Sequence, residues 1–247
     1  MPTATKCDAM KRVKRLFFVA ASAACSLTAL AEGIDGELRA DLVSGYIWRG
    51  QNNAGISVQP TAAISWRGLR LGAWGSYELS GKHDTGRELD LTLSYTVKGF
   101  SVGVTDYFIG ADSPYFHYCA HSTRHTFEAT VGYDFGFMAV NWSTNFLGLD
   151  GRNPWNGKRA YSSYLQLSAP FHLGPFDWTA TVGMVPWSTD FYAADHSRHF
   201  HVNTVSLQAG YTVKCGAKFE LPVYANVCAN PSSNSMFFFI GCTLTAF

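Results

Sequence analysis

Apolar residues occupy every second position in one stretch of this chain after another. Between residues 57 and 67 the apolar series is Val58, Pro60, Ala62, Ile64 and Trp66, set between serine, glutamine, threonine and arginine. Between 88 and 98 the series is Leu89, Leu91, Leu93, Tyr95 and Val97, set between Glu88, Asp90, Thr92, Ser94, Thr96 and Lys98. A period of two places the two series on opposite faces of a strand. Repeated strands with one apolar and one polar face are typical of a transmembrane β-barrel.

The alternation runs through twelve stretches of strand length, which we expect at 37–48, 57–67, 69–79, 87–98, 100–108, 125–134, 137–146, 160–169, 176–185, 201–213, 217–227 and 236–247. Short connectors at Gly68, Gly99, 135–136, 170–175 and 214–216 interleave with long ones at 49–56, 80–86, 109–124, 147–159, 186–200 and 228–235. Outer-membrane barrels have short periplasmic turns and longer extracellular loops. The sequence therefore predicts an all-β fold, a transmembrane antiparallel up-and-down barrel of about twelve strands.

Aromatic residues on the predicted apolar face gather at both ends of the strands. Near the short connectors these are Trp66, Tyr95, Phe100, Tyr133, Trp178, Tyr211, Phe219 and Phe247; near the long ones they are Trp48, Tyr77, Phe108, Phe146 and Tyr161. Aromatic rings collect at the two interfaces of a membrane, so two girdles are expected of a barrel. A soluble β-sandwich would place such rings in the middle of its strands.

The first 31 residues are typical of a secretory signal peptide. Lys11, Arg12, Lys14 and Arg15 precede the apolar run 16–30, and Ala29-Leu30-Ala31 supplies a cleavage site. We therefore expect a signal peptide at 1–31 and one barrel domain at 32–247, exported to the bacterial outer membrane. A lipoprotein alternative would use Cys25, but Ser22 stands where a large aliphatic residue is expected.

Charge and hydrophobicity exclude other classes of protein. Residues 1–31 hold five of the 19 Lys and Arg and one of the 18 Asp and Glu, so the remainder has a formal charge of −3. No basic patch suggests a nucleic-acid partner, and no later stretch is long and apolar enough for a transmembrane helix. The expected partners are outer-membrane lipid, small polar solutes and the outer-membrane assembly machinery, which a terminal Phe247 at the end of an alternating strand would engage. No cofactor is expected.

Three segments carry a family resemblance, and the first of them is the most specific. Residues 41–50, Asp-Leu-Val-Ser-Gly-Tyr-Ile-Trp-Arg-Gly, resemble the opening strand of the TorF-type family of outer-membrane porins. Residues 71–76 resemble the next strand of that family, and Asn230-Pro231 with the Gly241 strand resemble its ending. The resemblance implies a barrel with a channel role, and it supplies no catalytic residues.

The polar face of the predicted strands holds the candidate pore lining. Its members carry both signs of charge and several hydrogen-bonding groups: Glu37, Arg39, Asp41, Arg70, Trp74, Glu78, Glu88, Asp90, Glu128, Tyr164, Gln166, Gln208, Lys218 and Glu220. Such groups could select among solutes in a narrow channel, or they could pair across the lumen and fill it. Arg49, at the end of the first strand, could line the pore mouth or cap a neighbouring loop.

Histidines gather on or beside the long loops. His117, His121 and His125 would share one face of a helix, and His199 and His201 would share one face of a strand. Imidazoles grouped in this way could bind Zn²⁺ or Cu²⁺. Exposed loops also tolerate histidine, and no cysteine or acidic ligand completes a recognisable set, so no metal is assigned.

Two functions other than a channel fit the same barrel. Ser163, His201 and Asn203, which the alternation places on the lipid-facing side, could form a nucleophilic set as in outer-membrane lipid hydrolases. No compact motif joins them, so we expect no enzyme. A structural or adhesive barrel could display Tyr115-Phe116-His117-Tyr118 and Trp155-Asn156; alternatively the loops at Pro114 and Pro154 could fold inward and narrow the lumen.

Four cysteines follow the predicted signal peptide: Cys119, Cys215, Cys228 and Cys242. Export would permit disulfides, and the number is even. Cys119 and Cys215 fall at opposite ends of the predicted barrel and should not pair with each other.

Overall fold

The computed structural model describes residues 33–80, 87–110, 114–119, 122–192, 199–216 and 219–246. The predicted signal segment 1–31 lies outside these residues. The strands are β1 (Ile34–Val43), β2 (Tyr46–Trp48), β3 (Gln51–Ala54), β4 (Ser57–Trp66), β5 (Leu69–Glu78), β6 (Arg87–Val97), β7 (Phe100–Ile109), β8 (His125–Asp134), β9 (Ala139–Gly148), β10 (Ser163–Leu173), β11 (Phe176–Val185), β12 (His201–Lys214), β13 (Glu220–Asn230) and β14 (Ser235–Thr245).

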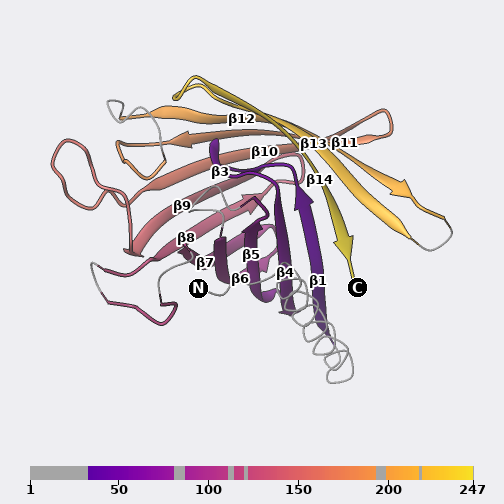
Figure 1. The fold of residues 1–247 in the computed structure, drawn as a ribbon, viewed down its shortest axis with the longest axis horizontal. Coiled ribbons are helices and arrows are strands. Elements are labelled where there is room, and N and C mark those ends of the chain that lie inside the picture. The colour runs from indigo at the N-terminus through magenta and orange to yellow at the C-terminus, as the bar shows by residue number, and fades with distance from the viewer. Residues whose placement is uncertain are drawn as a thin grey trace, which may run out of the picture.

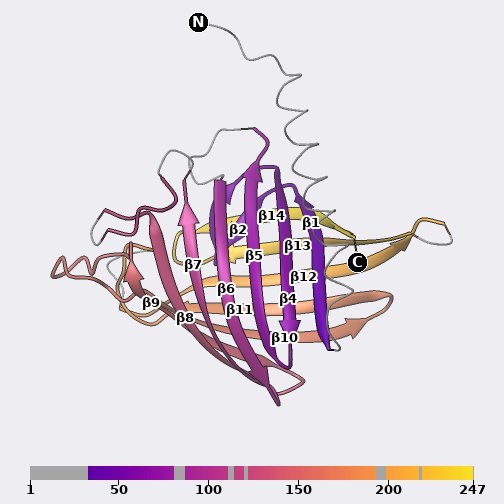
Figure 2. The ribbon, with the colours of Figure 1, turned by 90° about the horizontal axis from the view of Figure 1, so that it is seen from below.

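Twelve of these strands close into a barrel in which every neighbour is antiparallel. The order is β1-β14-β13-β12-β11-β10-β9-β8-β7-β6-β5-β4, and β4 pairs with β1 to complete the ring. Figure 1 shows β10–β13 spread along one side of the molecule, and Figure 2 shows β4–β8 side by side with β10–β14 crossing behind them. The predicted antiparallel barrel of twelve strands is confirmed. Among the described residues no helix is long and apolar enough to span a membrane.

The period of two sorts the side chains as predicted on most strands. The outward series exposes Trp66, Leu71, Leu93 and Val131, whereas the inward series is polar and largely buried. Exposed rings near the short turns are Trp66, Tyr95, Phe100, Tyr133, Tyr211 and Phe219, and those near the long loops are Tyr77, Phe146 and Tyr161. Trp48 is an exception, because it lies inside the barrel. Phe247 is outside the described residues.

The prolines within strands mark places where one ladder is interrupted. Pro60 pairs with Ala40 of β1, but the ladder from β4 to β5 omits positions 59 and 60. Pro170 pairs with Thr179 of β11, and the ladder from β10 to β9 ends before it, at Ser168. Proline has no N–H to donate, so it fits a strand only on such an unpaired side. For this reason β10 continues through Pro170, where the sequence predicted a connector, and the turn is Gly174-Pro175.

Two-residue turns with a basic residue followed by glycine join neighbouring strands. Arg67-Gly68 and Lys98-Gly99 both have positive φ at both positions, 48° and 87° in the first and 49° and 83° in the second. This is the type I′ geometry, whose twist suits a tight antiparallel hairpin. At the opposite end of the barrel most connections are long, but β13 and β14 are joined by residues 231–234 alone, a shorter loop than the predicted 228–235.

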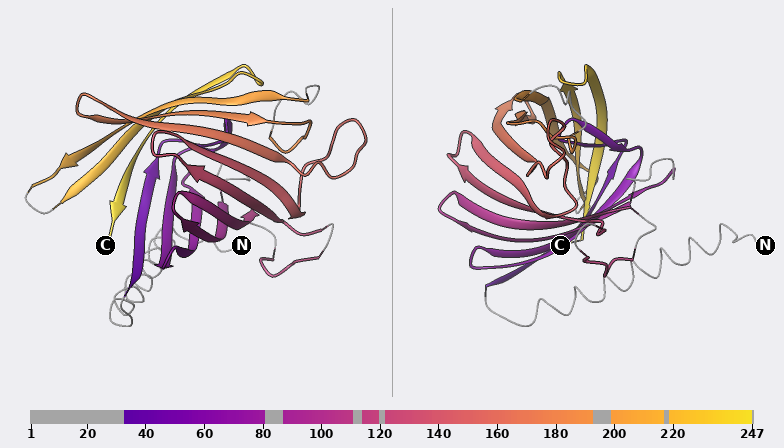
Figure 3. Two further views of the ribbon diagram at one scale, coloured as in Figure 1. Left: turned by 180° about the vertical axis from the view of Figure 1, so that it is seen from behind. Right: turned by 90° about the vertical axis from the view of Figure 1, so that its left-hand side faces the viewer.

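The main departure from the prediction lies between β1 and β4. The first strand was predicted to run through Trp48, but β1 ends at Val43. The chain then bends at Ser44 and Gly45 and forms a separate two-stranded hairpin, β2-β3. Figures 1 and 3 show this violet segment between the two sides of the barrel. The contacts of this hairpin place it in the lumen.

Candidate functional site: the lumen hairpin

The tip of the β2-β3 hairpin repeats the turn chemistry of the barrel's own short turns. Arg49 and Gly50 have φ values of 48° and 74°, and Trp48 pairs with Gln51 across the turn. Glycine is required at the second position: a Cβ on Gly50 would overlap the carbonyl oxygen of Asn203 on β12. The close approach shows that the tip is pressed against the far wall of the lumen.

The side chain of Arg49 is bound on that far side by a buried carboxylate. Arg49 Nη2 donates to Glu128 Oε1 at 2.8 Å and Nη1 donates to Glu128 Oε2 at 2.5 Å, a bidentate pair. The two side chains are 12% and 2% exposed. Nη1 also donates to Tyr192 Oη at 2.8 Å, and the guanidinium carbon lies 4.6 Å from the centre of the Tyr164 ring. Burial raises the pKa of Tyr192 above its ordinary value, so this hydroxyl stays neutral beside Arg49.

The backbone of the hairpin tip is held by two amide side chains. Asn203 Nδ2 on β12 donates to the carbonyl oxygen of Arg49 at 3.0 Å, and Asn230 Nδ2 on β13 donates to that of Gly50, also at 3.0 Å. Both asparagines are almost completely buried. At its base, the hairpin is fixed by Glu78 Oε1 of β5, which accepts from the N–H of Gly55 at 3.0 Å. The hairpin is therefore held from both sides of the barrel.

Aromatic rings pack around the hairpin. Trp48 lies against Tyr107 of β7 with the ring centres 5.8 Å apart and against Tyr192 at 6.0 Å. Tyr46 lies 5.4 Å from Trp74 of β5. Tyr192 comes from the connection between β11 and β12, so a second loop also enters the lumen. The loop at Pro114 does not: Tyr115 and Tyr118 pack on Phe108, His125 and Phe127, all of the outward series.

The hairpin fills the lumen at the end where the long loops are. Buried polar side chains surround it on strand after strand: Gln59, Thr61, Ser76, Glu78, Glu88, Asp90, Glu128, Ser143, Asn145, Asn203, Asn226 and Asn230. At the short-turn end the lumen is more open. There Glu37 bridges Arg39 at 2.8 Å and Arg70 at 2.6 Å, and all three side chains are 35–37% exposed.

The two sides of the lumen differ in chemistry. On β1 and β4–β8, which we call the ionic wall, the inward residues include Glu37, Arg39, Asp41, Arg70, Glu78, Glu88, Asp90 and Glu128. On β9–β13, the neutral wall, the inward residues between the strand ends are mostly amides, hydroxyls and tyrosines, including Asn141, Ser143, Tyr164, Gln166, Thr181, Ser206, Gln208 and Asn226. Among the described residues of the neutral wall, inward groups other than tyrosine that carry a charge or titrate stand only toward the strand ends, at His172, Asp177, His201, Lys214, Glu220 and Cys228.

Several lumen-facing polar atoms near the hairpin have no hydrogen-bond partner among the described residues. They are Thr61 Oγ1, Asn145 Oδ1, Asn203 Oδ1 and Asn226 Oδ1. The carboxyl groups of Glu88 and Asp90, by contrast, interact with each other. A buried polar group without a partner costs about 1–3 kcal/mol. Native interiors hold few such groups, so their concentration around one hairpin marks this part of the lumen as suited to water or a polar solute.

The predicted pore-lining residues lie on the lumen side of their strands. Trp74 packs on Tyr46, Tyr164 Oη donates to Thr204 Oγ1 at 2.8 Å, and Gln166 donates to Ser168 at 3.2 Å. Gln208 accepts from Asn226 at 3.3 Å, Asp41 binds Arg39 at 2.7 Å, and Glu220 is exposed at the start of β13. Lys218 falls outside the described residues. Arg49 lies inside the lumen at the tip of the hairpin, where it also binds Tyr192 of the connection between β11 and β12. Its place in a turn could have been read from the Arg-Gly pair that also forms the turn at 67–68.

The predicted histidine groupings are wrong. His125 begins strand β8, so it shares no helix with His117; its Nδ1 is 2.8 Å from Asp106 Oδ1 and its Nε2 is 2.6 Å from the carbonyl oxygen of Tyr115. His199 precedes β12 and stacks on Trp155, whereas His201 is inside the barrel. His121 lies outside the described residues, and within them no three His, Cys, Asp or Glu are arranged to hold a metal.

The predicted lipid-facing set of Ser163, His201 and Asn203 is also wrong. The register between β11 and β12 shifts at Gly183, which pairs with Thr204, while Met184 pairs with Val202. Asn203 is the extra residue, and this bulge turns Asn203 and His201 toward the lumen. Ser163 keeps its outward position beside Thr144, at 2.8 Å between hydroxyl oxygens. The three side chains therefore do not face one another.

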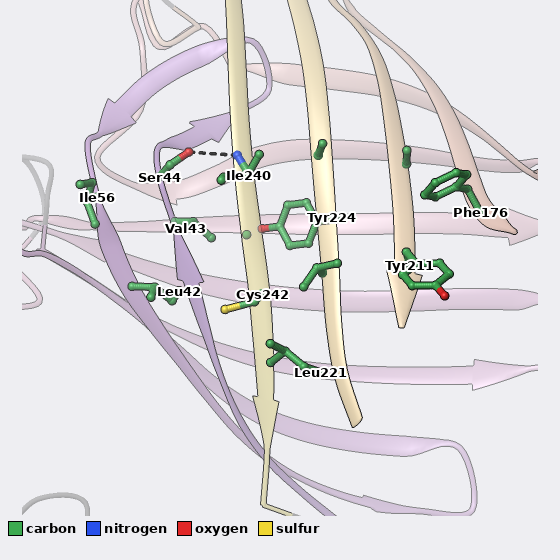
Figure 4. A pocket seen from close by; sticks show the side chains of 14 residues that line it. Leu42, Val43, Ser44, Ile56, Phe176, Tyr211, Leu221, Tyr224, Ile240 and Cys242 are labelled. Atoms are coloured by element: carbon green, nitrogen blue, oxygen red, sulfur yellow. Dashed lines mark hydrogen bonds between the residues drawn. The ribbon is translucent and has the colours of Figure 1, made fainter. Parts of the chain in front are cut away.

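An apolar hollow of about 660 Å³ lies on the barrel wall at the seam between β1 and β14. Most of its side chains belong to the outward series, including Leu42, Ile56, Tyr211, Ile240 and Cys242, and Figure 4 shows them along β1, β14 and the neighbouring strands. The lining is almost wholly apolar, unlike the lumen. The four cysteines Cys119, Cys215, Cys228 and Cys242 are all free thiols.

Comparison with known proteins gives a family and two similar folds. The model of Gcw_chp, described as a bacterial protein of unknown function, matches residues 36–227. No curated protein is similar enough to count as a match. A structure of the NanC porin is 8% identical, with a TM-score of 0.47, and covers 86% of this chain and 99% of its own. OmpF of Salmonella typhi, solved with daunomycin, is 11% identical, with a TM-score of 0.38, and covers 86% and 97%. Both likenesses concern the barrel fold alone.

Proposed function

Since the chain belongs to the Gcw_chp family of bacterial proteins of unknown function, we propose from its lumen that it is a narrow outer-membrane channel for small polar solutes, closed by the β2-β3 hairpin. The proposal includes export by the signal segment 1–31 and insertion by the outer-membrane assembly machinery into outer-membrane lipid. It treats the protein as a transporter without enzymatic activity. The resemblance of residues 41–50 to TorF-type porins agrees with it.

The observation that carries the proposal is the set of unpartnered polar atoms around the hairpin. A barrel that served only as a scaffold gains stability by pairing or removing buried polar groups. Here Thr61, Asn145, Asn203 and Asn226 each have a buried oxygen on the lumen side without a hydrogen-bond partner among the described residues. These atoms are hydrogen-bonding positions for a passing polar solute and its water.

The contacts of the hairpin are suited to reversible closure. Its tip is held by one ion pair to Glu128, by hydrogen bonds with Tyr192, Asn203 and Asn230, and by ring packing of Trp48. Water can replace each of the polar contacts when the hairpin moves. The tip contacts strands β8, β12 and β13, whereas its base is tied to β5 through Glu78, so the tip can leave its wall while the base stays fixed.

Planar-bilayer recording of the purified protein tests the proposal. We expect stable conductance steps for the wild type, and more frequent or larger steps for Arg49→Gln, because the hairpin tip loses its bidentate pair. Arg67→Gln is the matched control: it alters the same Arg-Gly turn at the other end of the barrel, where Arg67 is exposed. A protein that stays silent with Arg49→Gln, while folding as a barrel, contradicts a channel.

The other two candidate functions give different results in the same experiment. Hydrolysis of phospholipid or lipid A by a silent barrel would favour an enzyme, but the bulge at Asn203 separates the only predicted nucleophilic set. Silence in both assays would favour a structural or adhesive barrel. The exposed rings of Phe116 and Trp155 on the loops are the feature that such a role would use.

A further inference from the structure

We propose that the connection between β9 and β10 forms a binding site for a phosphate group, built around Arg152 and Arg159. The connection spans residues 149–162 at the long-loop end of the barrel. It borders a polar cavity of about 240 Å³ lined by Thr123, Gly148, Leu149, Asp150, Gly151, Arg152 and Arg159. The site is separate from the lumen hairpin, and the proposal is independent of channel activity.

The first observation is a pair of like charges placed opposite each other. Arg152 and Arg159 form an isolated antiparallel bridge, so their side chains start from the same side of the loop. Like charges directly opposite in such a pair are destabilising. Within the described part of the chain neither guanidinium has a carboxylate in ion-pair range: Arg152 Nη1 donates to the carbonyl oxygen of Gly157 at 2.9 Å, and Arg159 Nη2 donates to that of Gly148. A bound anion would compensate both charges at once.

The second observation is a buried donor without an acceptor. Nη1 of Arg159 is buried and has no hydrogen-bond partner among the described residues. A guanidinium presents its donors in a planar fork that matches the oxygens of phosphate or carboxylate. Arg159 therefore uses one side of its fork on Gly148, while its Nη1 lacks an acceptor beside the cavity that Arg159 lines.

The other lining groups favour a tetrahedral oxyanion. Thr123 Oγ1 accepts from the N–H of His125 at 3.0 Å, which leaves its hydroxyl proton available for donation. Asp150 also lines the cavity, but its Oδ1 accepts from the N–H of Gly151 at 2.7 Å, from that of Ser162 at 3.3 Å and from Asn145 Nδ2 at 3.2 Å. With two arginines and one compensated carboxylate, the lining itself has a net positive charge, and the carboxylate of Asp190 beside it accepts from the backbone N–H of Arg152.

The loop that carries the site is held in one shape before any ligand binds. The N–H of Asn153 donates to Lys158 at 2.8 Å and that of Ala160 donates to Gly151 at 2.9 Å. Gly151 is packed so closely against Thr189 and Asp190 that a Cβ would not fit there. A preformed loop loses little conformational freedom when it binds, which favours affinity.

The phosphate could be dissolved or part of a lipid headgroup, because the recognition chemistry is the same. Arg159 lies beside the exposed ring of Tyr161, with 5.9 Å from its guanidinium carbon to the ring centre. Tyr161 belongs to the aromatic band near the long loops, so the site is at the level where lipid headgroups would be.

Isothermal titration of the full-length protein in uncharged detergent, with inorganic phosphate and with short-chain phosphatidic acid as probes, tests the site. We expect saturable binding of at least one probe, weakened about tenfold or more by Arg159→Gln through loss of a charged hydrogen bond. Lys158→Gln, which removes an exposed charge of the same loop that does not line the cavity, should leave binding unchanged. Tighter binding of phosphatidic acid identifies the lipid source, and equal or tighter binding of inorganic phosphate identifies the dissolved one.

Two results would overturn the proposal. One is a folded wild-type protein that binds neither probe. The other is equal weakening by Lys158→Gln and Arg159→Gln, which would show attraction to the net charge of the loop and not to a site. If Arg159→Gln fails to fold as judged by circular dichroism, Arg152→Gln takes its place, since Arg152 is exposed and, among the described residues, its side chain bonds only to its own loop.

Discussion

The ionic wall and the neutral wall of the lumen hold the same hairpin by different means. The ionic wall binds the side chain of Arg49 through the carboxylate of Glu128, a contact between two buried charges. The neutral wall binds the backbone of the same turn, through Asn203 at the carbonyl of Arg49 and Asn230 at that of Gly50. The ionic wall therefore supplies the counter-charge for the residue at the tip. The neutral wall fixes the shape of the turn and adds only uncharged contacts to the same guanidinium, from Ser143 and Tyr164.

This division separates the residues that hold the hairpin closed from those that set the charge of the lumen. An amide that binds a backbone carbonyl fixes the hairpin without adding charge to the lumen. The charged residues of the ionic wall can then vary the electrostatic potential of the lumen, provided that Glu128 remains. The comparison predicts that closure depends on both walls, while selectivity for ions depends on the ionic wall alone.

The largest effect is expected from breaking the ionic contact at one partner. Glu128→Gln leaves the guanidinium of Arg49 buried without a counter-charge, which should reduce the free energy of unfolding by about 3–5 kcal/mol. Urea unfolding in detergent measures the change. The double variant Arg49→Gln with Glu128→Gln should recover part of the loss, because no unpaired charge remains. If the loss of unfolding free energy in the double variant equals the sum of the losses in the two single variants, the two residues are not coupled.

A smaller effect is expected from the neutral wall. Asn203→Ala or Asn230→Ala removes one hydrogen bond to the hairpin backbone, at a cost of about 1–3 kcal/mol. Open events in planar bilayers should become more frequent, with unchanged preference between cations and anions. Asn226→Ala is the control, since Asn226 is also on β13 but donates to Gln208. A changed ion preference in the Asn203 variant would contradict the prediction that ion selectivity depends on the ionic wall alone.

The smallest effect on stability is expected at the short-turn end of the ionic wall. Arg70→Gln removes a pair with Glu37 whose side chains are both more than a third exposed, and such pairs contribute about 0–1 kcal/mol. The reversal potential in a salt gradient should nevertheless shift toward cations, because a positive group leaves the open half of the lumen. Gln166→Ala, on the neutral wall, should leave this potential unchanged.

The barrel could be predicted from the sequence because the alternation of apolar and polar residues is a property of each strand by itself. Alternation at Val58–Trp66 and Leu89–Val97 assigns each side chain to a face without knowledge of the neighbouring strand. The rule fails where one residue is added, as at Asn203, because a bulge reverses the two faces and depends on the pairing with β11. His201 and Asn203 were therefore assigned to the wrong side, while Gln208 and Tyr164 were assigned correctly.

The hairpin was missed by the sequence prediction for a different reason. Tyr46, Ile47 and Trp48 continue the alternation of β1, so periodicity alone extends the strand through them. The Arg49-Gly50 pair was a turn signal of the same kind as Arg67-Gly68, and it could have indicated a hairpin. Its partners could not be predicted, because Glu128, Asn203 and Asn230 lie 79, 154 and 180 residues further along the chain.

The position of the hairpin has a consequence for the order in which the molecule is assembled. The hairpin follows β1 directly, and β1 and β14 meet through five residue pairs among the described residues, against ten between β1 and β4. Contacts between such distant parts of a chain form late, so we expect the β1-β4 pair and the hairpin that joins these strands to form before the β1-β14 seam closes.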